Sequence, residues 1–161
     1  MRLDRSWIER NIPHHGRMCL LDEVIEWDAG HIRCRSSTHR RPDHPLRSKN
    51  RLGAACGIEY AAQSMAVHGA LAGGAAAGAG IIRSEVGFLA GLRDVQLHVA
   101  RLDDLHGDLI ADAELIAGDH GSALYEFALR SEAQPQRLLS GRATVVFDAH
   151  ERFKTNEQFR T

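Results

Sequence analysis

The sequence predicts an α+β domain in which one long buried helix packs against one antiparallel β-sheet. Three observations support this prediction. Residues 52–72 are apolar almost all round and rich in Ala, Met and Leu, which favours a buried helix over a strand. Residues 31–37 alternate between two faces, as a strand with one wet face does. From residue 109 onward, apolar residues recur at every second position between short polar turns, which predicts a meander of antiparallel strands.

The first third of the chain predicts a helix and two strands. Residues 3–11 are expected to form a short helix that ends before Pro13, because the residue before a proline avoids the helical region. Residues 18–27 are dense in apolar residues and predict a buried strand, alone or with a turn. The next strand, from His31, is expected to bury Ile32, Cys34 and Ser36 on one face.

A long polar loop at residues 39–51, with two prolines and many charges, precedes the central helix. Gly and Ala residues at 73–80 are expected to end that helix. Residues 81–100 then predict one long or broken strand, with Gly87 and Gly91 as possible bulges. The strands of the meander are predicted at residues 109–117, 122–130 and 139–147.

Composition indicates one globular domain over residues 1–161, with a core at about 12–148 and a charged tail at 149–161. The formal net charge of −1 gives no general attraction to nucleic acid or to an anionic membrane. The three cysteines are scattered without CxxC spacing, and no apolar run follows the first residues. We therefore expect a protein of the reducing cytoplasm.

Glu59 is the most informative residue, because it interrupts an otherwise apolar helix. Burial of a lone carboxylate is costly, and the usual response is a raised pKa. A carboxyl that stays protonated near neutrality can serve as a general acid. Gln63, one turn later, could fix this carboxyl by a hydrogen bond. The alternative is a purely structural ion pair between Glu59 and an arginine such as Arg47.

Histidines are the natural bases at neutral pH, and His39 and His44 lie in the loop that leads into the helix. Each taken alone is more often a surface residue. The His14-His15 pair is interpreted first as a polar turn, with a tunnel-lining role as the lesser possibility. His68 is expected to be a core or interface histidine bonded to the backbone.

Other classes of site find no support in the sequence. The His and Cys residues lack the spacing of zinc ligands, and no HExxH, GxSxG, P-loop or Rossmann motif occurs. Nucleic-acid-binding motifs are also absent. The arginine-rich stretch at residues 33–51 is either a solvated loop or a docking patch for an acidic partner.

Several short motifs, in order along the chain, resemble those of FabZ-type 3-hydroxyacyl-carrier-protein dehydratases. The matching segments are Ile12-Pro13-His14 with Leu20-Leu21-Asp22, Pro42-Asp43-His44-Pro45, Ile58 through Gln63, and Phe88-Leu89-Ala90-Gly91-Leu92. The resemblance is greater still to the ApeP subgroup, which is associated with aryl polyene pigment biosynthesis. There the similar segments are His39, Pro45-Leu46-Arg47, Gly57 through Gln63, and His68 through Leu71.

This resemblance implies a hotdog fold, in which an antiparallel sheet wraps a long central helix, and a dimer with its active site at the interface. It implies dehydration of a 3-hydroxyacyl thioester, carried on the phosphopantetheine arm of acyl carrier protein, to the trans-2-enoyl thioester, without cofactor or metal. The implied dyad is a histidine of one subunit and Glu59 of the other. The histidine position of the FabZ pattern is Arg40 here, so His39 is the first choice and His44 the second.

The resemblance also places substrate contacts at His44, Gly53, Ala54, Gln63 and Phe88. Backbone N–H groups near Gly53 and Ala54, at the helix start, would stabilise the enolate oxygen that develops when the base removes a proton. Two alternatives stay open. The chain could be a non-catalytic subunit of a dehydratase heterodimer, or it could be a thioesterase, because the hotdog fold also hosts thioester hydrolysis.

Overall fold

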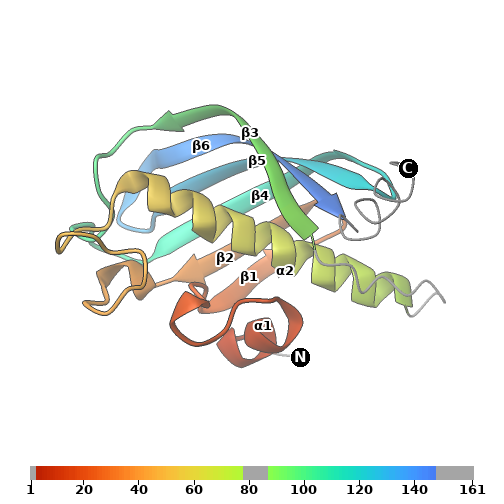
Figure 1. Cartoon of the computed structure of the whole chain (residues 1–161), viewed down its shortest axis with the longest axis horizontal. Coiled ribbons are helices and arrows are strands. Elements are labelled where there is room, and N and C mark those ends of the chain that lie inside the picture. The colour runs from red at the N-terminus through yellow and green to blue at the C-terminus, as the bar shows by residue number, and fades with distance from the viewer. Residues whose placement is uncertain (1–2, 78–86, 148–161) are drawn as a thin grey trace, which may run out of the picture.

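The computed structural model describes residues 3–77 and 87–147. Two α-helices and six strands make up the fold (Figure 1). Three short 3-10 helices lie between them, at Gly16–Met18, Thr38–Arg40 and Ala54–Cys56. The main elements are α1 (Arg5–Asn11), β1 (Glu23–Trp27), β2 (His31–Ser36), α2 (Gly57–Ala77), β3 (Gly87–Leu97), β4 (Leu109–Gly118), β5 (Ser122–Ser131) and β6 (Gln134–Phe147).

The six strands form one antiparallel sheet in the order β1-β2-β4-β5-β6-β3. Helix α2 runs across one face of this sheet, and α1 lies at its β1 side (Figure 1). The predicted α+β class and the meander of β4, β5 and β6 are therefore confirmed. Among the described residues, no helix is long and apolar enough to cross a membrane.

Alternation along the strands decides which side chains face the helix. In β2 the predicted inward residues are buried and their neighbours are half-exposed, and β5 repeats this pattern. Helix α2 approaches the sheet most closely at Gly57, where a Cβ atom would overlap the side chains of Leu139 and Leu129. A small residue is required there because the interior is packed to crystal-like density.

The ends of α2 differ from the prediction. Residues 52–56 are not α-helical, because the backbone of this stretch bonds to the loop after β3: Leu102 N–H donates to Leu52 C=O and Ala54 N–H donates to Ala100 C=O. At the other end, α2 passes through Gly73 and continues to Ala77. A glycine costs a helix only about 1 kcal/mol, which is too little to end one that is anchored over many residues. The rest of the predicted loop, 78–80, lies outside the described residues.

Residues 18–22 were predicted to be part of a strand, but only Glu23–Trp27 pair with β2 over a run of residues. Cys19, Leu20 and Leu21 are nevertheless fully buried. Their backbone is held mainly by individual hydrogen bonds from side chains rather than by a neighbouring strand. Of the predicted strand 81–100, residues 87–97 are found as β3, residues 98–100 are not in a strand, and residues 81–86 lie outside the described part of the chain.

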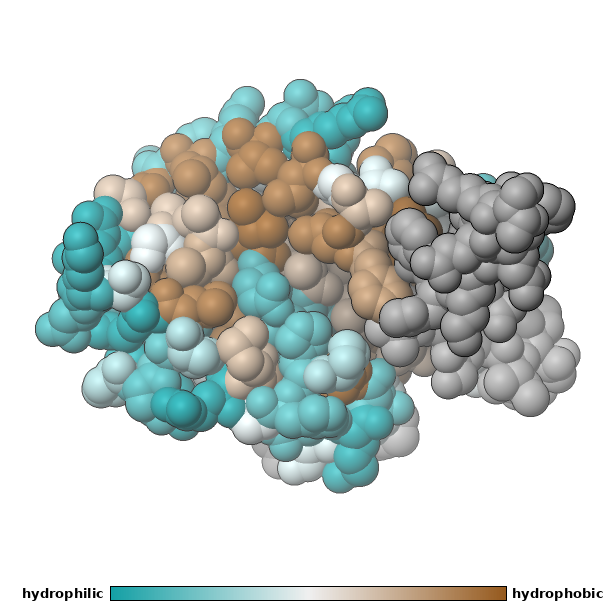
Figure 2. Space-filling model, viewed as in Figure 1, coloured by the Kyte–Doolittle hydropathy of each residue, from teal (hydrophilic) through white to brown (hydrophobic). Residues whose placement is uncertain are grey.

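Strand β3 is one edge of the sheet and is exposed along its whole length. Its register against β6 shifts around Gly91, as predicted, and again between Arg93 and Gln96, whereas none occurs at Gly87. Large apolar side chains on β3 are 36–48% exposed, and Figure 2 shows hydrophobic residues gathered on this side of the molecule. These side chains are Phe88, Leu89, Leu92, Val95 and Leu97.

Candidate active site

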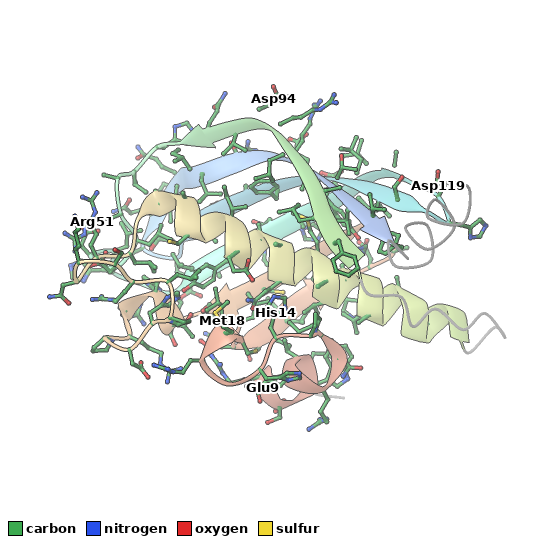
Figure 3. The ribbon with its side chains drawn as sticks, in the orientation of Figure 1. Glu9, His14, Met18, Arg51, Asp94 and Asp119 are labelled. Atoms are coloured by element: carbon green, nitrogen blue, oxygen red, sulfur yellow. The ribbon has the colours of Figure 1, made fainter. Side chains whose placement is uncertain are left out.

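The candidate site is built around Glu59, in the first turn of α2. Its side chain is 30% exposed, and one of its oxygens, Oε1, has two polar partners. His14 Nε2 lies 3.1 Å from Oε1, and Gln63 Nε2 donates to the same oxygen over 2.9 Å. His14 comes from the segment after α1, which passes beside α2 (Figure 3). The predicted hydrogen bond from Gln63 to Glu59 is therefore confirmed.

Gln63 also holds the segment that carries His14. It is fully buried, donates from Nε2 to the Met18 carbonyl over 2.8 Å, and accepts from Leu20 N–H at Oε1 over 2.9 Å. Gly16 adopts a φ of +58°, a left-handed conformation that a glycine reaches without strain, and so turns the chain between His14 and Met18. One side chain thus ties Glu59 to the segment that follows this turn.

The ionisation of Glu59 differs from the prediction. Burial alone raises the pKa of this carboxyl, but the hydrogen bonds from His14 and Gln63 and the charge of His14 outweigh burial and lower its pKa below the ordinary value. The expectation of a neutral carboxyl is therefore wrong for the single chain. The arginine alternative is wrong as well, because Arg47 lies 3.6 Å from Asp103 and is not the partner of Glu59.

His44 is buried on the other side of the helix start, with both ring nitrogens in use. Leu46 N–H donates to Nδ1 over 3.1 Å, so in the neutral ring the proton sits on Nε2, which lies 2.9 Å from the Tyr60 hydroxyl. The Tyr60 hydroxyl in turn lies 2.8 Å from Thr38 Oγ1. Burial, with Arg47 and Arg41 nearby, lowers the pKa of His44. The ring therefore has no free lone pair with which to accept a proton.

His39 is fully buried and differs from His44 in one respect. Its Nε2 lies 3.3 Å from the carbonyl oxygen of Leu105, which can only accept, so Nε2 carries the proton. Its Nδ1 is buried without a hydrogen-bond partner among the described residues. Burial lowers the pKa of His39, which keeps the ring neutral and Nδ1 unprotonated. Within the described chain, neither His39 nor His44 forms a polar contact with Glu59.

The predicted oxyanion donors lie just before α2. Ala54 N–H already donates to the Ala100 carbonyl over 3.2 Å, so in this conformation it is not available to an enolate oxygen. Gly53 forms an isolated bridge with Arg101. The remaining predicted contact, Phe88, lies on β3 opposite Val146 and is 40% exposed.

Comparison with known proteins identifies the family. The family model of ApeP-like proteins, described as ApeP dehydratase, matches residues 6–156. The chain belongs to the ApeP-like dehydratase family. Among curated protein sequences no match was found.

Solved structures share the fold of this ApeP-like chain. The dehydratase heterocomplex ApeI:P from Xenorhabdus doucetiae matches with a TM-score of 0.78 at 21% identity, covering 92% of this chain and 95% of that one. Zebra fish thioesterase superfamily member 2 matches with a TM-score of 0.58 at 13% identity, covering 88% and 94%. A hypothetical thioesterase from Streptococcus pneumoniae, solved with coenzyme A, gives 0.55 at 11%, covering 78% and 84%. These neighbours confirm the predicted hotdog fold.

Sequence reasoning underrated three residues of this ApeP-like site. The sequence favours a polar turn for His14, but the structure places its imidazole 3.1 Å from Glu59 Oε1. Tyr60 and Thr38 passed unnoticed, yet they hold His44. The sequence contains one signal for Tyr60: it follows Glu59 directly on a helix predicted to be buried, and the hydroxyl of a buried tyrosine needs a hydrogen-bond partner.

His68, the remaining predicted histidine, has structural partners. His68 is buried, with Nε2 2.9 Å from the Asp28 carbonyl and Nδ1 2.9 Å from the Tyr125 hydroxyl, so its predicted bond to the backbone is confirmed. In the part of the chain that the structure describes, no group of three or more His, Cys, Asp or Glu residues could hold a metal ion.

Proposed function

We propose that this chain acts in the dehydration of 3-hydroxyacyl thioesters, carried on the phosphopantetheine arm of acyl carrier protein, to trans-2-enoyl thioesters. The observation that carries the proposal is the attachment of Glu59 through one oxygen. Its Oε1 is bonded by His14 and Gln63, whereas its Oε2 has no hydrogen-bond partner among the described residues. The Glu59 side chain is also partly exposed. A carboxyl held in this way can exchange a proton with a ligand.

Dehydration needs a base for the C2 proton and an acid for the C3 hydroxyl. We assign the base to His39, since Nδ1 of its neutral ring has no partner while Nε2 is directed at the Leu105 carbonyl. Nδ1 takes the C2 proton, the C–O bond at C3 breaks, and the proton on Glu59 Oε2 leaves with the hydroxyl as water. One proton is removed and one supplied, so the double bond forms without any cofactor.

Glu59 must be protonated before it can give up this proton. In the single chain its pKa is lowered, which favours the carboxylate. A bound acyl chain would cover the exposed part of the side chain, and loss of water raises the pKa of a carboxyl. We therefore propose that Glu59 takes up its proton when substrate and a second subunit close the site.

The second subunit is expected at β3. A fully exposed edge strand with five large apolar side chains needs a cover, and pairing with the edge of another hotdog sheet supplies one. The heterocomplex that shares this fold supports a different hotdog chain as this partner. The partner chain would then supply one member of each dyad: a glutamate opposite His39 of this chain, or a histidine opposite Glu59 of this chain.

The state of the two dyad residues favours a second candidate, a subunit that is inactive alone. In the single chain Glu59 is ionised and His39 is fully enclosed, and no polar contact joins them. Such a chain would support catalysis only after pairing. All three cysteines are free, which fits the reducing cytoplasm that we propose for this reaction.

The test compares Glu59→Gln with Glu114→Gln, a matched change at an exposed glutamate on β4. Each variant is assayed with a 3-hydroxyacyl-carrier-protein substrate, by the absorbance of the enoyl thioester and by release of free thiol. We expect Glu59→Gln to lose turnover by about 10²- to 10⁴-fold, the usual contribution of a general acid, and Glu114→Gln to keep it. Unchanged turnover in Glu59→Gln contradicts the proposal, and thiol release by the wild-type chain indicates a thioesterase instead.

The partner is tested by Leu92→Arg on β3, with sedimentation velocity on the purified chain. A wild type that dimerises, with a variant that is monomeric and inactive, identifies a second copy of this chain as the partner, because a charge at the centre of an apolar contact is costly to bury. A wild type that is monomeric, folded and inactive supports the second candidate, in which a different hotdog chain is required.

A further inference from the structure

We infer that His14 is a positioning residue for Glu59: it occupies Oε1 together with Gln63 and leaves Oε2 as the oxygen that exchanges a proton with the substrate. This inference rests on the proposed role of Glu59 as the acid. It assigns a function to a residue outside the helix and the loop from which the dyad is drawn.

The geometry separates the two carboxyl oxygens. Oε1 has its partners at 2.9 Å and 3.1 Å, and both approach as N–H donors. In the carboxylate these donors stabilise the charge. When the carboxyl takes up a proton, Oε1 remains the acceptor, so the proton sits on Oε2. The same two contacts therefore serve both protonation states, and His14 need not move during the reaction.

His14 differs from the structural histidines of this chain in how it uses its nitrogens. His44 and His68 each have partners for both nitrogens, as expected of buried rings that tie elements together. His14 has one polar partner among the described residues, Glu59, and its Nδ1 is buried without one. The single polar contact of the His14 ring within the described chain is therefore the one that it makes with the Glu59 carboxyl.

The fastening of the turn is the task of Gln63, which bonds the backbone of Met18 and Leu20. Removal of His14 should therefore leave the turn in place and change the carboxyl alone. Of the titratable groups described, His14 is the one that contacts Glu59, and α2 contributes the neutral Gln63. Without His14, burial becomes the larger effect, and the pKa of Glu59 rises.

The experiment uses the full chain in three variants. His14→Leu removes the donor and the charge, His14→Gln keeps an N–H donor without the charge, and His15→Leu changes the exposed neighbour as a matched control. The titration of the Glu59 side-chain carboxyl carbon is followed by NMR, with Glu59→Gln used for assignment. Turnover is measured across the same pH range in the assembly that is active.

We expect the pKa of Glu59 to rise in His14→Leu, to rise less in His14→Gln, and to stay unchanged in His15→Leu. The pH-rate limb that belongs to Glu59 should move to higher pH in His14→Leu. Its maximal rate should fall by about 10- to 100-fold, the range expected for a misplaced catalytic group, with partial recovery in His14→Gln. If His14→Leu does not fold, His14→Gln and the control provide the comparison.

An unchanged Glu59 titration in His14→Leu or His14→Gln overturns the inference. The failure of the proposed function gives a different result: Glu59→Gln would then keep full turnover, whatever the titration shows. A Glu59→Gln variant that is inactive, together with a titration that does not respond to His14, refutes the role of His14 alone.

Discussion

Gln63→Leu tests whether one amide holds the site and much of the N-terminal half together. The substitution puts an apolar side chain of similar size in place of the amide and removes the three hydrogen bonds that Gln63 makes. The buried Leu20 N–H loses its acceptor, which costs about 1–3 kcal/mol. Glu59 Oε1 keeps His14 as a partner, so the loss of this hydrogen bond adds less.

The expected total is a loss of about 2–4 kcal/mol in the free energy of unfolding, after a small gain from the added apolar surface. For a domain of this size, each kcal/mol lowers the melting temperature by about 2–4 °C, so the expected decrease is roughly 5–15 °C. The measurement is urea unfolding followed by circular dichroism, with Gln136→Leu, an exposed position on β6, as the matched control.

Glu59 supplies a second readout in the same variant. Loss of one of its two donors should raise the pKa of Glu59. If Gln63→Leu and Gln136→Leu unfold at the same urea concentration, the hydrogen bonds of Gln63 are not what holds residues 18–20. The clamp on Glu59 would then need another explanation.

Further predictions concern packing and pH. Gly57→Ala should destabilise the fold by about 1–3 kcal/mol, because its Cβ would overlap two buried leucines, whereas Gly69→Ala, with open space at its Cβ, should stabilise it by about 0.5–1 kcal/mol; urea unfolding compares them. The pKa values of His39, His44 and His68 are lowered in the fold, so the unfolded chain binds protons first as the pH falls below about 6.5. Stability should therefore decrease with falling pH from there, by up to about 1.4 kcal/mol per pH unit for each histidine, and a flat profile between pH 7.5 and 5 would contradict their burial as neutral rings. Tyr60→Phe should destabilise by about 1–3 kcal/mol, since it leaves the His44 Nε2–H without an acceptor, and thermal unfolding measures this.

Much of the fold could be predicted because its elements follow simple periodicities. The inward face of β2 and the strands of the meander are fixed by alternation, and the apolar stretch around Glu59 could only be a buried helix. The helix ends were predicted less well, because tertiary bonds decide them. The Leu52 carbonyl accepts a hydrogen bond from Leu102 N–H in the loop after β3, and no local pattern of the sequence predicts this contact.

The site was predicted in part, and the reason lies in the length of its contacts along the chain. Gln63 and Glu59 are one helical turn apart, so their hydrogen bond follows from spacing alone. His14 reaches Glu59 across 45 positions, through a turn whose shape depends on the conformation of Gly16. Periodicity cannot show such a contact, and for the same reason the ionisation of Glu59 could not be inferred from its apolar neighbours.

A single connected set of hydrogen bonds explains why the helix carries its polar residues where it does. The Leu20 carbonyl accepts from Thr38 Oγ1, which also meets the Tyr60 hydroxyl and through it His44. On the other side of the same residue, Leu20 N–H reaches Gln63 and so Glu59 and His14. Because residues 18–22 have no neighbouring strand to pair with over their length, side chains bond their backbone instead: Gln63 of α2 bonds Met18 and Leu20, and the Ser36 and Thr38 hydroxyls donate to the Leu20 carbonyl. The segment that lacks regular structure is thereby anchored through side chains, and His14 lies just before it, beside Glu59.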